Sequence, residues 1–213
     1  MPAIRFWFDP ASTYSWLTVL RIGDAARDAD VEVHWQPFLL GPIFRARGWE
    51  TSPFNLDPAK GAHMWRDLSR RAAMLGQTVC RPDPFPGHSL RAARIMTAAR
   101  TEPWMPDFAG ALMTAAFVRG ADIAAPEVLT GALESAGAAP GGWLARAEAP
   151  ETKAALRAAT EEAAARGIFG APSFTVGDEL FWGDDRLEDA LAWASGRHPL
   201  QSDAWLDAPG PRV

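Results

Sequence analysis

The sequence predicts an α/β protein whose small sheet is built from both ends of the chain, with an all-helical segment inserted between the two halves. Three observations predict this class. The chain begins with a strand–helix–strand pattern, continues with a succession of helical patterns, and ends with strand–strand–helix. A proline preceded by a small residue, Ala171-Pro172, also opens the C-terminal strand region.

The N-terminal half begins with residues 3–9, where aromatic and other residues alternate as in a short strand. Apolar residues then recur at helical spacing over residues 12–29, with Ser12 or Thr13 available as the N-cap. Residues 31–38 alternate again and predict a second strand. A strand–helix–strand unit implies a right-handed crossover between two parallel neighbours.

The middle of the chain is predicted to be helical because Ala, Leu, Met, Arg and Glu dominate it. The predicted helices cover residues 59–75, 89–101, 106–120, 126–136 and 151–166. Pro- and Gly-rich runs separate them, including residues 82–87 and Pro140-Gly141-Gly142.

The C-terminal half is predicted to contain strands over residues 173–176 and 179–182, joined by a Gly-Asp turn, and a helix over residues 185–195. The chain after His198 is predicted to be irregular. Thioredoxin-like folds place a cis-proline at the mouth of a strand, and Pro172 stands in such a position. The element order therefore predicts a thioredoxin-like fold with an all-helical insertion domain.

In domain terms, residues 1–38 and 166–213 form the split thioredoxin-like domain, and residues 39–165 form the helical insertion domain. The composition is ordinary for a globular protein, with a net charge of −5 and no dense block of Lys and Arg, which argues against nucleic acid. Arg66, Arg70 and Arg71 are interpreted as a solvated helix face. No segment has the length of a membrane span and no leader pattern is evident, so we expect a cytoplasmic protein.

Cys80 is the only cysteine, which excludes an intramolecular disulfide, a Cys-x-x-Cys redox pair and a multi-cysteine metal site. The four histidines lack paired ligand spacing, so no metal site is predicted. No glycine-rich nucleotide loop is present. Most of the ten tryptophans are interpreted as core or interface residues, and one or two near the motifs are candidates for an aromatic substrate pocket.

Ser12 is the first candidate for chemistry. It occupies the loop before the first helix, where redox members of the thioredoxin fold carry their attacking cysteine. A hydroxyl there can donate a hydrogen bond to a bound thiolate, and the first amides of a helix favour negative charge. Lowering a thiol pKa from about 8.5 by one unit requires ~1.4 kcal/mol of preferential thiolate stabilisation. The alternative interpretation, that Ser12 is only an N-cap, is the better one for this residue taken alone.

The run Gly183-Asp184-Asp185-Arg186 is the second candidate, because a carboxylate and the local amides can hold the ammonium and carboxylate of an amino-acid group. Lys60 is the third, as a partner for a ligand carboxylate. Taken singly, acidic residues at a helix start are ordinary caps, and a lysine there is more often solvated.

Taken jointly, these motifs resemble the 2-hydroxychromene-2-carboxylate isomerase family, relatives of the kappa-class glutathione transferases in the DsbA-like thioredoxin-fold superfamily. The resemblance covers nearly the whole chain in order, and the combination is specific although each motif alone is weak. The motifs are Phe8-Asp9, Ser12-Thr13-Tyr14-Ser15, and residues 36–44, 51–56, 58–61, 64–68, 167–172 and 181–187.

The resemblance implies glutathione as the cofactor and gives the central residues their roles. Ser12 matches the serine that hydrogen-bonds the glutathione sulfur. Ala171, which precedes Pro172, matches the residue whose backbone pairs with the cysteinyl part. Thr13 departs from the pattern, since relatives usually carry a proline there, which favours the first turn of a helix.

The resemblance also implies the residues that hold the two ends of the tripeptide. Asp184 and Asp185 match a pair near the γ-glutamyl group. Lys60 matches a lysine near a glutathione carboxylate, and Asn55 is the candidate for an asparagine that binds glutathione in relatives.

The implied activity is isomerisation by reversible thiolate addition to a conjugated aromatic-catabolism intermediate. Two alternatives stay open: a kappa-class-like transferase or peroxidase, and a non-catalytic thioredoxin-like module that binds a ligand or a partner protein. The implied partners are a small aromatic substrate and, because relatives are commonly dimers, a second copy of the chain.

Overall fold

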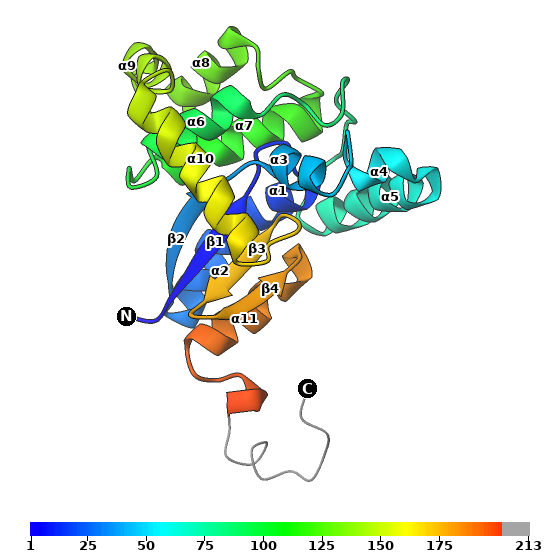
Figure 1. Cartoon of the computed structure of the whole chain (residues 1–213), viewed down its shortest axis with the longest axis vertical. Helices are drawn as coiled ribbons and strands as arrows, with labels where there is room; N and C mark the ends of the chain where they lie inside the picture. Colours follow the sequence, from blue (N-terminus) through cyan, green and yellow to red (C-terminus); the bar gives the residue numbers. More distant parts are fainter. Residues whose placement is uncertain (202–213) are drawn as a thin grey trace.

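The computed structural model describes residues 1–201, which form one four-stranded mixed sheet surrounded by helices (Figure 1). The strands are β1 (Ala3–Phe8), β2 (Glu32–Pro37), β3 (Ser173–Val176) and β4 (Glu179–Trp182), in the spatial order β2-β1-β3-β4. β1 pairs with β2 in parallel and with β3 antiparallel, so the two central strands join the two ends of the chain. The predicted α/β class and strand assignments are confirmed.

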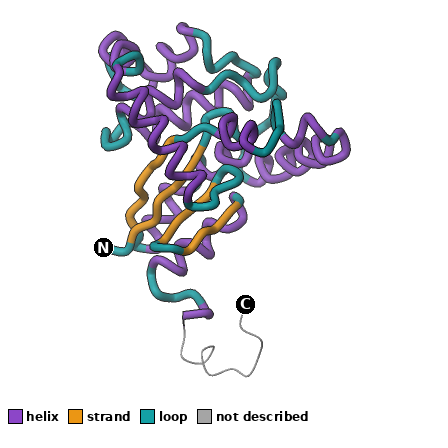
Figure 2. Tube along the Cα trace, in the orientation of Figure 1, coloured by secondary structure: helices purple, strands orange, loops and turns teal. Residues whose placement is uncertain are grey.

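Helices cover both faces of this sheet. They are α1 (Thr13–Val19), α2 (Ile22–Ala29), α3 (Leu40–Ala46), α4 (Pro53–Leu56), α5 (Pro58–Met74), α6 (Leu90–Ala98), α7 (Met105–Arg119), α8 (Pro126–Ser135), α9 (Pro140–Arg146), α10 (Pro150–Ala165) and α11 (Leu187–Ala194), with the short 3-10 helices η1 (Asp184–Arg186) and η2 (Pro199–Gln201). α2 and α11 pack on one face, and α10 crosses the other (Figures 1 and 2). α4 and α5 form a hairpin that projects sideways from the molecule (Figure 1).

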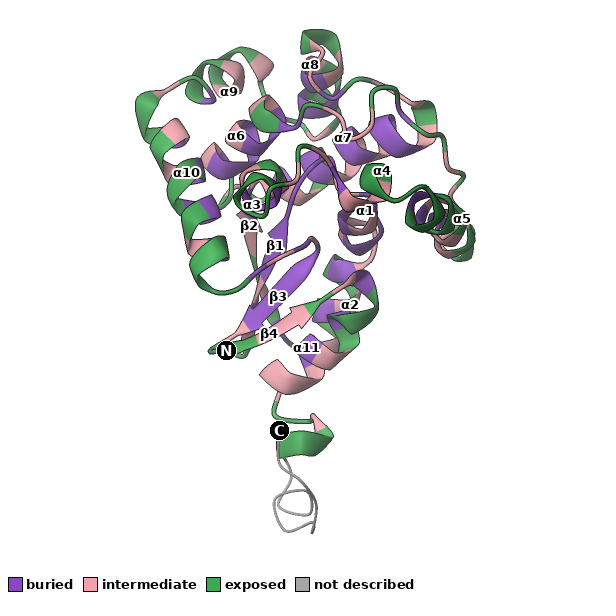
Figure 3. Ribbon diagram, turned by 45° about the vertical axis from the view of Figure 1, so that its right-hand side comes forward, coloured by how far each residue is buried: buried purple, intermediate pink, exposed green. Residues whose placement is uncertain are grey.

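The central strand β1 is mostly buried (Figure 3). Its side chains alternate between two apolar clusters, one on each face of the sheet. Ile4, Phe6 and Phe8 belong to the larger cluster, which continues into α6, α7 and α8. Trp7 points the other way and packs with Phe38 and with residues of α10 and the loop after it. The sheet and the helical segment therefore share buried contacts, and the division of the chain into two domains stays a prediction.

Two local predictions are wrong, and two short helices were not predicted. The helix predicted over residues 12–29 is two helices, because Arg21 leaves the helical conformation with φ −132° and turns its guanidinium to Asp184 and Glu188. Pro140-Gly141-Gly142 begins α9 instead of breaking the helical pattern, since a proline at the first helical position sacrifices no hydrogen bond. The short helices α3 and α4 had no prediction at all.

The predicted irregular tail falls partly on η2, and residues 202–213 lie outside the described residues. No helix within residues 1–201 combines the length and apolarity needed to cross a lipid bilayer.

Gly61 sets how closely α4 and α5 approach. A Cβ at this position would lie 2.2 Å from the carbonyl oxygen of Phe54, a backbone atom. We expect Gly61→Ala to lower the free energy of unfolding by about 1–3 kcal/mol through overpacking. The matched control is Gly131→Ala in α8, where a Cβ meets nothing within 4 Å and helix propensity favours alanine. Chemical denaturation of both variants would contradict this account if Gly61→Ala were as stable as Gly131→Ala.

Candidate active site

The sheet register brings the two ends of the chain together at one edge. Trp7 on β1 pairs with Ser173 on β3 in an antiparallel ladder. The loop that follows β1 therefore lies beside the segment that precedes β3, although about 160 residues separate them in sequence. The Ala171–Pro172 peptide bond is cis, as the sequence predicts.

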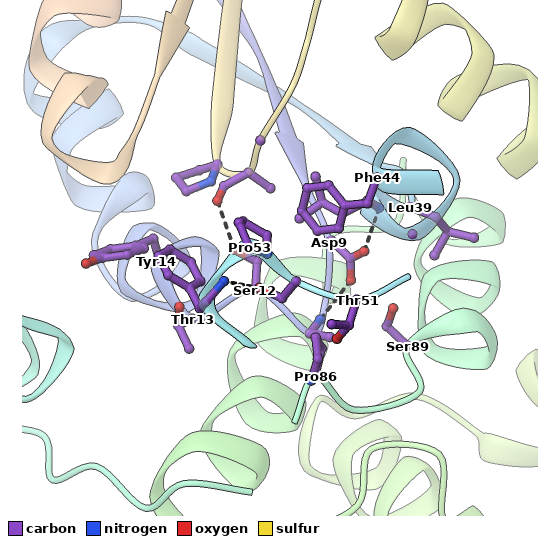
Figure 4. Close-up of a pocket in the computed structure, with 18 of the residues that line it drawn as sticks. Asp9, Ser12, Thr13, Tyr14, Leu39, Phe44, Thr51, Pro53, Pro86 and Ser89 are labelled. Carbon is purple, nitrogen blue, oxygen red and sulfur yellow. Dashed lines mark hydrogen bonds between the residues drawn. The ribbon is translucent and has the colours of Figure 1, made fainter. Parts of the chain in front are cut away.

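Ser12 lies at this junction (Figure 4). Its hydroxyl donates a hydrogen bond of 2.9 Å to the carbonyl oxygen of Ala171 and accepts one of 3.2 Å from the amide of Ser15. Ser12 is thus the N-cap of α1, which was the alternative interpretation of this residue. It also faces the cis-proline segment. The N-cap function uses the hydroxyl oxygen as an acceptor, which leaves the hydroxyl proton for a second partner, the Ala171 carbonyl in this structure.

Ser12 opens onto a cavity of about 1160 Å³. Besides Ser12, six of the predicted or neighbouring residues line it: Thr13, Lys60, Ala171, Pro172, Asp184 and Asp185. Figure 4 shows Tyr14 and Phe44 on opposite sides of Ser12, so the cavity extends in both directions from the hydroxyl. The structure therefore brings together all the predicted site residues except Asn55.

Asp184 and Asp185 have different environments although they are adjacent. Asp184 is 3% exposed, and both of its carboxylate oxygens have partners. Thr18 and Arg21 donate to one oxygen at 3.0 and 2.9 Å, and Arg71 donates to the other at 2.6 Å. Asp185 is largely exposed, and within residues 1–201 its carboxylate has only a 3.4 Å contact with Arg186. Asp184 holds the walls of the cavity together, whereas Asp185 is accessible to a ligand.

The two remaining candidates come from the α4–α5 hairpin. Lys60 lies in the first turn of α5 and lines the cavity, and its ammonium group forms no ion pair within residues 1–201. Asn55 is not part of the cavity wall, because its side-chain amide donates to the carbonyl of Phe85 at 2.8 Å and to Thr51 at 3.1 Å. Thr51 itself lines the cavity. A role of Asn55 in glutathione binding stays a prediction.

Tyr14 connects α1 to α5 on one side of Ser12. Its phenol donates a hydrogen bond of 2.8 Å to Asp67, and burial together with this carboxylate raises the pKa of Tyr14 well above its ordinary value. Tyr14 is therefore a hydrogen-bond donor and not a base at neutral pH. The neighbouring Thr13, at the position where relatives usually have proline, donates to the sulfur of Met64 at 3.5 Å and so adds a second contact to α5.

Asp9 is a buried acidic residue that belongs to one of the motifs of the resemblance but had no predicted role. Its carboxylate accepts hydrogen bonds of 2.9 Å from the amides of Ala11 and Leu40, which joins the loop after β1 to the loop after β2 (Figure 4). Burial raises the pKa of Asp9, while these two amides and the Ser89 hydroxyl act in the opposite direction. Asp9 fixes the loop that carries Ser12.

Arg71 corrects the interpretation of the basic residues on α5. Arg66 and Arg70 are exposed as predicted, but Arg71 reaches Asp184 and lines the cavity. The helical spacing of the residues could have indicated this position of Arg71. Met64, Leu68 and Ala72 form the buried side of α5, and Asp67 and Arg71 lie next to that side.

A metal centre has no support in residues 1–201, where no three His, Cys, Asp or Glu side chains are grouped to hold a metal ion.

The two adjacent aspartates give a matched test. Asp184→Asn leaves Arg21 and Arg71 facing a neutral amide, so the free energy of unfolding should fall by about 2 kcal/mol. Asp185→Asn, at an exposed position, should leave it within about 0.5 kcal/mol of the wild type. Equal effects of the two substitutions in denaturant titrations would contradict the division of roles described above.

Tyr14 is the only tyrosine, so its ionisation can be followed directly by tyrosinate absorbance. Its pKa is raised in the folded chain, so the unfolded chain loses this proton first as the pH rises. The stability that the protonated phenol provides is complete below pH 10 and is lost above it. We expect no tyrosinate in the folded protein near pH 10, and a lower pKa in Asp67→Asn. A normal titration of Tyr14 in the folded wild type would contradict the buried Tyr14–Asp67 contact.

Comparisons with known proteins agree with this fold. A 2-hydroxychromene-2-carboxylate isomerase from Sphingobium xenophagum is 29% identical over 190 residues, which are 87% of this chain and 94% of the relative. The structure of a 2-hydroxychromene-2-carboxylate isomerase superposes with a TM-score of 0.77 at 24% identity, covering 97% of this chain and all of that one.

A more distant structure, the cytosolic disulfide reductase DsbM from Pseudomonas aeruginosa with glutathione, superposes with a TM-score of 0.60 at 16% identity, covering 91% of this chain and 96% of that one. The family model described as DSBA-like thioredoxin domain matches residues 3–192. The chain therefore belongs to the DsbA-like thioredoxin domain family.

Proposed function

We propose that the protein is a glutathione-dependent isomerase that acts on a conjugated aromatic compound in the manner of 2-hydroxychromene-2-carboxylate isomerase. The observation that carries this proposal is the Ser12 hydroxyl beside the cis-proline segment, at the wall of a large cavity. The 29% identical relative supports the reaction type. Cys80 is the only cysteine and is not among the residues that line the cavity, so the thiol of such a reaction has to come from a bound molecule.

The residues present fit glutathione. The amide of Ala171 makes no hydrogen bond to the described part of the chain, so it is available to the cysteinyl backbone. Asp185 offers an accessible carboxylate to the γ-glutamyl ammonium, and Lys60 offers an unpaired ammonium to a peptide carboxylate. One protein of the same fold is described with glutathione, so the fold is compatible with this ligand.

Ser12 is the residue assigned to the sulfur. Its hydroxyl donates to the Ala171 carbonyl in this structure, and rotation about its side-chain bonds would redirect the proton to a sulfur in the cavity. The Ser15 amide, which donates to the Ser12 oxygen, polarises the hydroxyl and strengthens it as a donor. A hydrogen bond to a charged group is worth about 1.5–3 kcal/mol, which corresponds to about one to two pKa units of the thiol.

The chain's own residues thus bind the tripeptide, orient it along β3 and stabilise the ionised sulfur. Bound glutathione would supply the nucleophilic thiolate for a reversible addition to the conjugated compound, which is the chemistry that cis–trans isomerisation requires. The aromatic residues around the cavity hold the reacting compound near Ser12 and exclude water from it.

The test is the pH dependence of Ser12→Ala. We expect the pKa of bound glutathione, followed by thiolate absorbance, to rise by at least about one unit, because the variant lacks the donor. Isomerisation of 2-hydroxychromene-2-carboxylate should then fall about tenfold at neutral pH and less at alkaline pH, where the thiol is ionised without help. Ser12→Thr, which keeps the hydroxyl, should restore most of the activity.

Three outcomes would contradict the proposal. An equal loss of activity at both pH values would show that Ser12 does not stabilise a thiolate. Isomerisation that does not require glutathione would show that glutathione is not the cofactor. Accumulation of a stable glutathione conjugate would favour the kappa-class-like transferase instead.

A further inference from the structure

A continuous row of aromatic rings and one guanidinium group lines the cavity on the α3 side of Ser12. It begins beside the cis-proline segment, where the rings of Phe169 and Trp182 are 4.6 Å apart. The Arg47 guanidinium lies 5.7 Å from the Phe169 ring and 5.9 Å from the Trp49 ring. Trp49 in turn lies 5.8 Å from Phe44. This row is called the Arg47 platform below.

Arg47 has a free hydrogen-bonding edge. Its guanidinium is placed by contacts with rings, and within residues 1–201 it forms no ion pair or hydrogen bond to another side chain. Glu50 also lines this end of the cavity but makes no ion pair with Arg47. A guanidinium has five N–H donors in one plane, a geometry that matches the two oxygens of a carboxylate.

The aromatic part of the platform is accessible as well. Trp182 is 52% exposed, which is unusual for so large an apolar side chain, and its indole N–H has no partner within the described residues. The ring cannot fold away easily, because it packs closely over Gly170, where a Cβ would lie 2.3 Å from the indole nitrogen. A flat, accessible ring surface next to an unpaired cation suits a planar anion.

We propose that the Arg47 platform binds an aromatic carboxylate, with the ring against Phe169, Trp182 and Trp49 and the carboxylate on the guanidinium of Arg47. This assignment rests on the proposed function in one respect: the bound aromatic carboxylate is taken to be the compound that the thiolate attacks. It makes Arg47 the residue that selects a charged substrate over a neutral one of the same shape.

The platform also orients the compound. Phe169 and Ala171 belong to the same segment, so the Trp182 end of the platform lies next to the place assigned to the sulfur. Arg47 follows α3 and lies in the middle of the row, between Phe169 and Trp49. A compound whose carboxylate is held by Arg47 and whose ring lies on Phe169 and Trp182 is therefore directed toward Ser12.

Arg45 also lines the cavity but is a weaker candidate for the same role, since its guanidinium has no cation–π contact with a ring within residues 1–201.

The experiment measures binding by calorimetry in the absence of glutathione, with 2-naphthoate and its neutral analogue 2-naphthamide as probes. We expect the wild type to prefer the carboxylate, and Arg47→Gln to weaken 2-naphthoate by about tenfold while leaving 2-naphthamide within about twofold. Trp49→Leu should weaken both probes by similar factors, because it removes ring contact but no charge. Arg157→Gln on α10, an exposed arginine outside the cavity, is the control of equal charge.

Three results would overturn the assignment. The first is a wild type that binds both probes equally, and the second is an Arg47→Gln variant that behaves like Arg157→Gln. The third concerns the glycyl carboxylate of glutathione, the second source of the same chemistry. If Arg47→Gln weakened glutathione about tenfold but left its glycyl ethyl ester unchanged, Arg47 would serve the tripeptide and not an aromatic compound. Because the probes are measured without glutathione, failure of the proposed cofactor would not affect this result.

Discussion

The hydrogen bond between the Ser12 hydroxyl and the Ala171 carbonyl is the contact around which the site is built. It exists because β1 and β3 are central neighbours in the sheet, and their register aligns the loop after one strand with the cis-proline segment before the other. Asp9 holds the Ser12 loop from the opposite direction through the amides of Ala11 and Leu40. The position of one hydroxyl thus depends on three segments far apart in sequence.

A second group of contacts fixes the walls of the cavity. Asp184 accepts hydrogen bonds from Thr18 and Arg21 at the end of α1 and from Arg71 on α5. Tyr14 on α1 donates a hydrogen bond to Asp67 on α5. Buried ion pairs of this kind gain little net stability but are costly to break, because one charge is then left without a partner. Their effect here is to hold α1, α5 and η1 in one arrangement, which leaves Asp185 and Lys60 accessible.

The regular part of the fold could be predicted from local patterns, since alternation in β1 and β2 and the Ala171-Pro172 pair are visible in the sequence. The break between α1 and α2 could not, because it depends on Arg21 meeting residues 163 positions away. The same reason explains why Asp184 and Asp185 looked equivalent. Burial separates them, and the side chains that surround Asp184 are Thr18, Arg21 and Arg71, which lie far from its own segment in sequence. The Arg47 platform joins three segments and has no local signature at all.

The most direct measurement is a crystal structure of the protein with glutathione and without any substrate. The account predicts that the sulfur lies within about 3.5 Å of the Ser12 oxygen, that the cysteinyl backbone pairs with Ala171, and that the Ser12 hydroxyl has left the Ala171 carbonyl. A tripeptide bound elsewhere in the cavity, with the bond between Ser12 and Ala171 intact, would contradict it.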